Sequence, residues 1–157
     1  MNIHQLPLTP FRTPFFLANP HVQTILPKFI KLPKPNYQRR LHPDRTGTTQ
    51  VAYDFVFANT DNQPNLDKPL AVMFHGLEGS SDSHYAIAFA HQAHQLGYDA
   101  VIVHFRGCGG VDNTSELDYN AGDTAEAVHM FNLLKTQYGY SRIVASGVSL
   151  GANMLAR

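Results

Sequence analysis

The amino-acid sequence predicts an α/β protein with a mostly parallel sheet. Three short apolar runs, at residues 70–74, 100–105 and 143–148, alternate with segments of helical periodicity. Each run leads into a glycine-containing turn. Continuous apolar runs of this length are typical of strands covered on both faces, and strand–helix alternation favours right-handed β-α-β units on one sheet.

A hairpin is expected before the first of these runs. Residues 37–41 and 51–57 are rich in β-forming residues, and the segment between them contains Pro43, Asp44 and Gly47. A polar loop at residues 59–68 then leads to the first buried strand.

The first helix of the alternating series is predicted over residues 84–96, with Ser83 or Asp82 as its N-cap and Gly97 after its end. Its expected apolar stripe consists of Tyr85, Phe89, Ala93 and Leu96. His91 and His94 have a spacing that a metal ion could use. Because no carboxylate or cysteine stands beside them, we interpret them as polar-face histidines and expect no metal.

The second helix is predicted to begin at Asp123, with Glu126 completing a capping-box-like start, and to end before Gly139. Val128, Phe131 and Leu134 are its expected apolar face. A third helix is expected to follow the last strand.

Composition limits the classes of function. The 157 residues are enough for one domain, and a formal net charge of zero gives no electrostatic argument for nucleic-acid binding. A single cysteine, Cys108, excludes an intrachain disulfide and fits a reducing compartment. There is no long apolar run, and the first residues lack the pattern of a signal peptide, so we expect a cytoplasmic protein.

The first 43 residues differ from the rest of the chain. They contain six of the twelve basic residues, eight of the ten prolines and no acidic residue. This density of proline predicts an irregular arm. Two interpretations stay open: the arm contacts an anionic membrane surface weakly, with Phe15 and Phe16, or it lies across the protein's own acidic body.

The most informative stretch is residues 143–154, in which a predicted strand runs into a Gly-x-Ser-x-Gly pentapeptide centred on Ser149. This pattern is typical of a sharp strand-to-helix turn that exposes a nucleophilic serine. Gly147 and Gly151 fit such a turn because side chains at both positions would collide where strand and helix come close together. Ser149 is therefore the candidate nucleophile.

A serine nucleophile also needs donors for the oxyanion that forms when it attacks a carbonyl group. One expected donor is the backbone N–H of Leu150, at the start of the helix. The other is the N–H of Leu77, in the loop after the strand at residues 70–74. His75 and Gly76 are expected to support this loop.

Five ordered motifs extend the pattern beyond the pentapeptide: residues 21–27 (HVQTILP), 75–80 (HGLEGS), 105–110 (FRGCGG), 121–124 (AGDT) and 147–155 (GVSLGANML). Together they resemble the YheT-like α/β-hydrolases, relatives of ABHD-type esterases and phospholipid hydrolases. The resemblance covers nearly the whole chain from about residue 19. It implies a serine hydrolase that acts on acyl or lipid carboxylic esters without a cofactor, with Ser149 as nucleophile. We interpret Arg106 and Cys108, within these motifs, as turn and packing residues.

One feature departs from that family. Its catalytic acid and histidine follow the nucleophile in the chain, but here Arg157 is the last residue and no histidine follows His129. We therefore expect residues 44–157 to be the N-terminal part of a single α/β-hydrolase domain, ending in the helix after the serine. The isolated chain is expected to be inactive and to expose an apolar strand edge.

Two other functions stay open at this point. The chain could be a non-catalytic remnant of the fold that binds a lipid or a protein. Alternatively, the serine could transfer its acyl group to an alcohol other than water. The sequence does not identify the ester, the acyl chain length or the oligomeric state.

Overall fold

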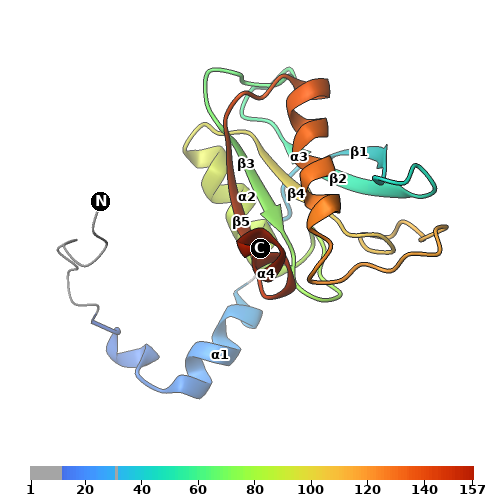
Figure 1. Ribbon diagram of the computed structural model, residues 1–157. Helices are drawn as coiled ribbons and strands as arrows, with labels where there is room; N and C mark the ends of the chain where they lie inside the picture. Colours follow the sequence, from blue (N-terminus) through green and yellow to red (C-terminus); the bar gives the residue numbers. More distant parts are fainter. Residues whose placement is uncertain (1–11, 31) are drawn as a thin grey trace, which may run out of the picture. The chain divides into compact units, whose positions relative to one another are not determined.

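The computed structural model describes residues 12–30 and 32–157 (Figure 1). The chain separates into two compact units, Met1–Lys31 and Leu32–Arg157, and each is described here by itself.

The first unit contains a short 3-10 helix, η2 (Phe15–Leu17), and the helix α1 (Pro20–Phe29). Asn19 caps α1 by accepting a hydrogen bond from the His21 N–H at 2.8 Å, and Pro20 occupies the first helical turn, where its missing N–H costs nothing. The irregular conformation expected for the arm is therefore wrong for residues 20–29. Residues 1–11 of the expected arm lie outside the described part of the chain.

The second unit is a mixed five-stranded sheet with three helices. Its elements are β1 (Gln38–Pro43), β2 (Gln50–Val56), β3 (Leu70–Phe74), α2 (His84–Gln95), β4 (Ala100–Val103), α3 (Thr124–Tyr138), β5 (Ile143–Gly147) and α4 (Leu150–Ala156). The strand order is β1-β2-β4-β3-β5. The predicted hairpin is confirmed as β1 and β2, so residues 38–43 of the expected arm belong to the sheet.

Only part of the sheet is parallel. β3 is parallel to β4 and to β5, as the alternating pattern predicted, but β2 runs antiparallel to β4. The strands β4, β3 and β5 form the predicted parallel part, and the predicted N-terminal hairpin adds two antiparallel strands, so the sheet as a whole is mixed.

The helices cover both faces of the sheet, and alternate residues of each strand face opposite layers. In β3, Leu70, Val72 and Phe74 belong to the core under α3 and α4, whereas Met73 packs with Ala86 of α2. These side chains are at most 4% exposed. The strand alternation thus produces two hydrophobic layers from one continuous apolar run.

The predicted helices are present, but their buried faces differ from the expected ones. In α2 the fully or nearly buried residues are Ala86, Ala90 and Ala93, and Leu96 is 54% exposed. In α3, Val128 is 58% exposed. Small alanines allow α2 to approach the sheet closely, so the buried stripe follows the small residues rather than the large ones.

The strand order places a topological switch point between β3 and β5. The chain leaves β3 toward α2 and leaves β5 toward α4, and these two helices belong to layers on opposite faces of the sheet. Ligands of open α/β sheets bind where two neighbouring strands send their connections to opposite sides. Phe74 and Gly147, the last residues of these strands, are register partners, so both following loops begin at the same level.

Candidate active site

Ser149 lies in the turn between β5 and α4 and has an unusual backbone conformation. Its φ of 51° and ψ of −110° place a non-glycine residue in a sparsely populated region. Such backbone strain costs about 1–3 kcal/mol and is concentrated at functional sites. The residue is exposed, and no described side chain hydrogen-bonds its hydroxyl group. The turn thus presents an exposed hydroxyl at the carboxyl end of β5.

The two glycines of the pentapeptide are required sterically. A Cβ atom on Gly147 would come within 2.6 Å of the backbone of Gly151 and Ala152. A Cβ on Gly151 would come within 2.5 Å of the Phe74 carbonyl oxygen at the end of β3. Gly151 thus allows α4 to start directly against the neighbouring strand, a contact that the pentapeptide alone does not reveal.

The loop after β3 lies beside the serine. A Cβ on Gly76 would be 3.5 Å from the Ser149 Cβ, and the Val148 N–H donates a 3.0 Å hydrogen bond to the Phe74 carbonyl oxygen. The backbone N–H groups of Leu77 and Leu150 make no hydrogen bond within residues 12–30 and 32–157. One of these unpaired donors thus lies in the loop after β3 and the other at the start of α4, the two segments next to Ser149.

His75 is a structural histidine in this chain. It is fully buried, and its Nε2 accepts the Phe105 N–H at 3.3 Å. An amide N–H can only donate, so the proton of the neutral ring is on Nδ1, which donates to the Gly76 carbonyl oxygen at 2.7 Å. Burial lowers the pKa of His75 to about 4. Both nitrogens are occupied, so His75 has no free nitrogen with which to act as the base for Ser149.

The bond from His75 orients the neighbouring peptide group. The Gly76 carbonyl oxygen also accepts the Gly79 N–H at 3.0 Å. In a trans peptide the C=O and N–H groups point in opposite directions. Two bonds on the Gly76 oxygen therefore fix the direction of the Leu77 N–H.

A tyrosine holds the next residue of the same turn. Glu78 has a φ of 54°, which is also unusual for a non-glycine residue. Its N–H donates to the Tyr119 hydroxyl oxygen at 3.1 Å, and this hydroxyl donates to the Glu78 carboxylate at 2.8 Å. The Tyr119 ring stacks on Phe105 at 5.2 Å between centroids. The turn after β3 is thus fixed at both ends.

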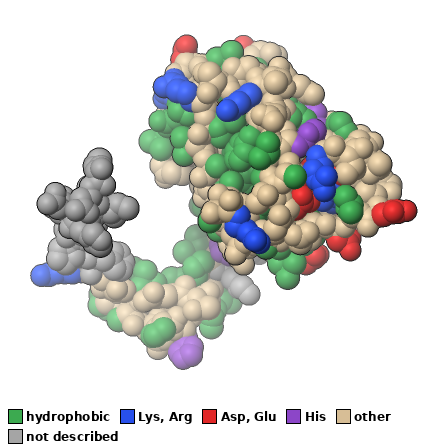
Figure 2. Space-filling view, in the orientation of Figure 1, with side chains coloured by type: hydrophobic (Ala, Val, Ile, Leu, Met, Phe, Trp, Pro, Cys, Tyr) green, Lys and Arg blue, Asp and Glu red, His purple; other side chains and the backbone are tan. Residues whose placement is uncertain are grey.

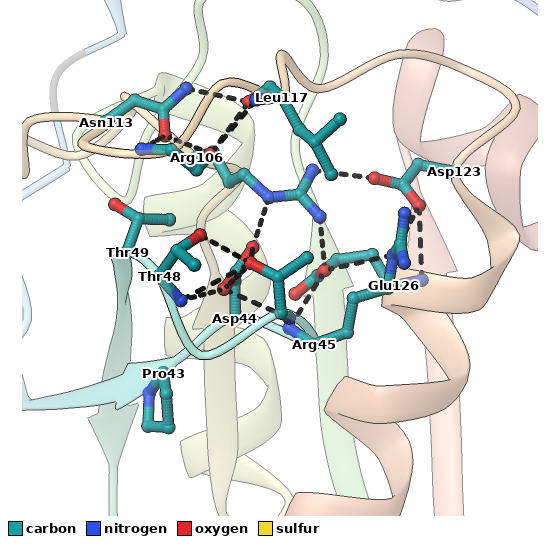
Figure 3. A network of polar contacts seen from close by, with 12 residues as sticks. Pro43, Asp44, Arg45, Thr48, Thr49, Arg106, Asn113, Leu117, Asp123 and Glu126 are labelled. Atoms are coloured by element: carbon teal, nitrogen blue, oxygen red, sulfur yellow. Dashed lines mark hydrogen bonds and ion pairs between the residues drawn. The ribbon is translucent and has the colours of Figure 1, made fainter.

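Arg106, interpreted from the sequence as a turn and packing residue, is the centre of a buried ionic network (Figure 3). Its guanidinium donates to Asp44 at 2.7 Å, to Asp123 at 2.7 Å and to Glu126 at 2.5 Å. Burial opposes ionisation of Asp44, but the bond from Arg106 lowers its pKa to about 2. Burial raises the pKa of Glu126, whose second oxygen has no partner among the described groups.

A second buried cluster resembles a catalytic triad in composition but not in geometry. The Ser81 hydroxyl donates to Asp54 at 2.5 Å, and Arg39 forms two 2.7 Å bonds with the same carboxylate. The nearby His104 accepts the Ser81 backbone N–H on Nε2 at 3.1 Å and bonds the Ala52 carbonyl oxygen through Nδ1. Because both ring nitrogens are occupied, His104 cannot take the serine proton, and the cluster anchors the loop instead.

The polar pocket next to this cluster does not include the candidate nucleophile. It has a volume of about 730 Å³ and is lined on one side by residues 78–82 and on another by residues 107–110. Lys34 and Arg39, the cations at its wall, are already paired with Asp82 and Asp54. Ser149 therefore lies outside this pocket.

The described residues give no support to a metal centre. Across residues 12–30 and 32–157, no three His, Cys, Asp or Glu side chains converge in a way that could hold an ion. His91 bonds the Pro33 carbonyl oxygen at 2.6 Å, and His94 is exposed on α2. In the same part of the chain, every helix is too short or too polar to cross a bilayer.

Comparison with protein families and known sequences agrees with this geometry. Residues 69–157 match the model of the α/β-hydrolase fold. The chain is 38% identical over 144 residues to YheT of Escherichia coli, a protein named as an esterase; the match covers 88% of this chain and 40% of YheT. It is 29% identical to zebrafish (Danio rerio) ABHD2, named as a monoacylglycerol lipase, over 87% of this chain and 32% of ABHD2. The chain thus spans less than half the length of these relatives.

Solved structures show the same fold. An esterase of Pyrococcus furiosus superposes with a TM-score of 0.60 at 18% identity, over 76% of this chain and 44% of the esterase. A serine hydrolase homologue from Coxiella burnetii gives a TM-score of 0.60 at 18% identity, over 80% and 58% of the two chains. These structures share the fold, and the family model together with the YheT and ABHD2 matches shows that the chain belongs to the α/β-hydrolase family, among its YheT- and ABHD-like members.

Proposed function

We propose that this chain supplies the nucleophile and the oxyanion donors of a serine hydrolase that cleaves carboxylic esters of lipids. The observation that carries the proposal is the strained, exposed Ser149 between two unpaired backbone donors, Leu77 and Leu150. The ester class follows from relatives named as an esterase, a monoacylglycerol lipase and a phospholipase.

The geometry suggests the following chemistry. The Ser149 Oγ attacks the acyl carbonyl carbon, and its proton passes to a base. The carbonyl oxygen becomes an oxyanion that accepts hydrogen bonds from the Leu77 and Leu150 N–H groups. Each such donor contributes roughly 3–4 kcal/mol to transition-state stabilisation. The C–O bond then breaks, the base protonates the departing alcohol, and water hydrolyses the acyl-serine.

In this proposal the base and its carboxylate partner lie outside the 157 residues. His75 and His104 have no free ring nitrogen, and no described histidine is bonded to Ser149. The curated relatives are more than twice as long as the matched region. The chain alone is therefore expected to lack measurable esterase activity, with kcat about six orders of magnitude below that of a complete enzyme.

The test compares the chain with a form completed by the part of YheT that follows the matched region. A fluorophosphonate probe should label the completed form at Ser149, and the form should hydrolyse p-nitrophenyl acyl esters. Ser149→Ala should abolish both. A folded, completed form that the probe does not label would refute the nucleophile and favour a non-catalytic binding module. Turnover by the chain alone that disappears in Ser149→Ala would refute the external base.

A further inference from the structure

The helix α1 has an apolar stripe that the other described residues of its unit, 12–19 and 30, leave exposed. Val22, Ile25, Leu26 and Phe29 follow the i, i+3, i+4, i+7 spacing that places side chains on one face of a helix. Val22 is 37% exposed, Ile25 52% and Phe29 73%. Figure 2 shows hydrophobic side chains along this helix. The stripe overlaps the motif at residues 21–27, to which the proposed reaction assigns no role.

Two aromatic side chains extend this apolar surface toward the N-terminus. Phe15 is 90% exposed and Phe16 is 58% exposed, and their rings meet edge to face at 5.7 Å. Phenylalanines in this position are typical of segments that insert their apolar side into the boundary between lipid headgroups and acyl chains.

The charge of the segment identifies the kind of surface that would cover the stripe. The segment 12–30 contains two basic residues, Arg12 and Lys28, and no acidic residue. Docking on the acidic body of the protein would also match these charges. An anionic lipid surface matches both the charges and the row of apolar side chains, because it attracts cations and accepts apolar side chains beneath its headgroups.

We propose that residues 12–30 bind in the plane of an anionic lipid surface, with Val22, Ile25 and Phe29 directed toward the acyl chains. The binding does not depend on catalysis, so Ser149→Ala should bind lipid as well as the native chain. A failure of the proposed ester hydrolysis would therefore leave this inference intact.

The chain contains no tryptophan, so Phe29→Trp provides a single fluorescent reporter on the stripe. With vesicles of phosphatidylglycerol, its emission should shift to shorter wavelength, and added salt should reverse the shift. Vesicles of phosphatidylcholine should produce a much smaller shift. An equal response to both lipids would overturn the role of charge.

Two aspartate substitutions, each made in the Phe29→Trp reporter, distinguish the effect of the apolar stripe on binding from the effect of charge. Ile25→Asp places an acid on the apolar face, and Thr24→Asp places the same acid on the opposite face. Ile25→Asp should bind phosphatidylglycerol vesicles roughly tenfold more weakly than Thr24→Asp, because an apolar contact is lost as well. Equal binding would overturn the proposal.

The emission of Phe29→Trp without vesicles tests whether something other than lipid covers the stripe. An emission maximum already at short wavelength, independent of protein concentration, would show that the stripe packs on the protein's own body. One that changes with concentration would show that a second copy covers it. Either result would contradict a lipid-facing helix.

Discussion

His75 is a buried imidazole that the protein keeps neutral. Its two ring nitrogens link the start of the loop after β3 to the Phe105 backbone, and burial lowers its pKa to about 4. The residue therefore acts through the position of the Gly76–Leu77 peptide group and not through proton transfer.

The low pKa of His75 makes the stability of the fold dependent on pH. Above about pH 6.5 the ring is neutral in both the folded and the unfolded state. As the pH falls from 6.5 toward 4, the unfolded chain binds a proton that the folded protein excludes, so the free energy of unfolding decreases by up to about 3 kcal/mol. Burial lowers the pKa of His104 as well, which adds to the decrease.

Urea unfolding at pH 7 and at pH 4.5 measures this dependence. His75→Gln keeps an acceptor for the Phe105 N–H but does not titrate, so the difference between the two pH values should become smaller by roughly 2–3 kcal/mol. The same difference in both proteins would show that His75 does not cause the dependence. Asp44, whose pKa in the folded protein is about 2, affects the stability only below about pH 4, the pKa of an aspartate in the unfolded chain.

The sequence was sufficient to identify Ser149 and its glycines because the pattern is local. Steric exclusion within five consecutive residues determines which positions must be glycine. The same reasoning could not predict that Gly151 touches the end of β3, since this contact depends on strand order. The roles of Ser149, Leu77 and Leu150 in catalysis remain predictions.

At the scale of elements, the Arg106 network connects a hairpin and a helix through buried charges. It joins the turn of the β1–β2 hairpin, through Asp44, to the first turn of α3, through Asp123 and Glu126. Asp123 also caps α3 by accepting the Glu126 N–H, as the sequence predicted. One side chain thus fixes the hairpin and the helix relative to each other.

Removing the cation should therefore destabilise the protein strongly. Arg106→Met keeps much of the side-chain length but leaves Asp44 and Glu126 buried without their cation. The free energy of unfolding should decrease by about 3–5 kcal/mol. Arg40→Met removes an exposed cation and should change it by less than about 0.5 kcal/mol. Equal effects in denaturant unfolding would mean that the network contributes no net stability.

This network could not be predicted from the sequence. The partners of Arg106 lie 62, 17 and 20 positions away, and no local pattern links them. The buried faces of α2 and α3 were assigned imperfectly for a related reason: periodicity identifies a helix, but the neighbouring layer decides whether alanine or leucine faces it. Helix α1 was missed because proline density was read as irregular structure, although Pro20 suits a helix start.

At the scale of the molecule, β5 is an edge strand of the five-stranded sheet. Its outer side pairs with no strand of the described residues, and Val144 in its middle is 60% exposed. Figure 2 shows exposed hydrophobic side chains over the area where Figure 1 draws β5 and α3. An apolar strand edge of this kind is a template for pairing with another chain.

The 157-residue chain is therefore expected to self-associate through β5. Val144→Lys should shift the chain toward the monomer, because a charge on an edge strand opposes strand pairing. Val128→Lys is the matched control, since Val128 is 58% exposed but lies on α3. Light scattering over a range of concentrations compares the two. A monomeric native chain, or equal effects of the two lysines, would contradict pairing through β5.

The pairing of Phe74 with Gly147 limits how far the loops after β3 and β5 can shift relative to each other. The two loops that would bind an ester begin at these partners. The hydrogen bonds between β3 and β5 therefore determine the position of one loop relative to the other. A slip of one residue would displace one loop by about 3.3 Å, which is enough to break a hydrogen bond of about 2.9 Å. A substitution elsewhere in β3 or β5 that shifts the register would thus displace one of these loops without contacting Ser149.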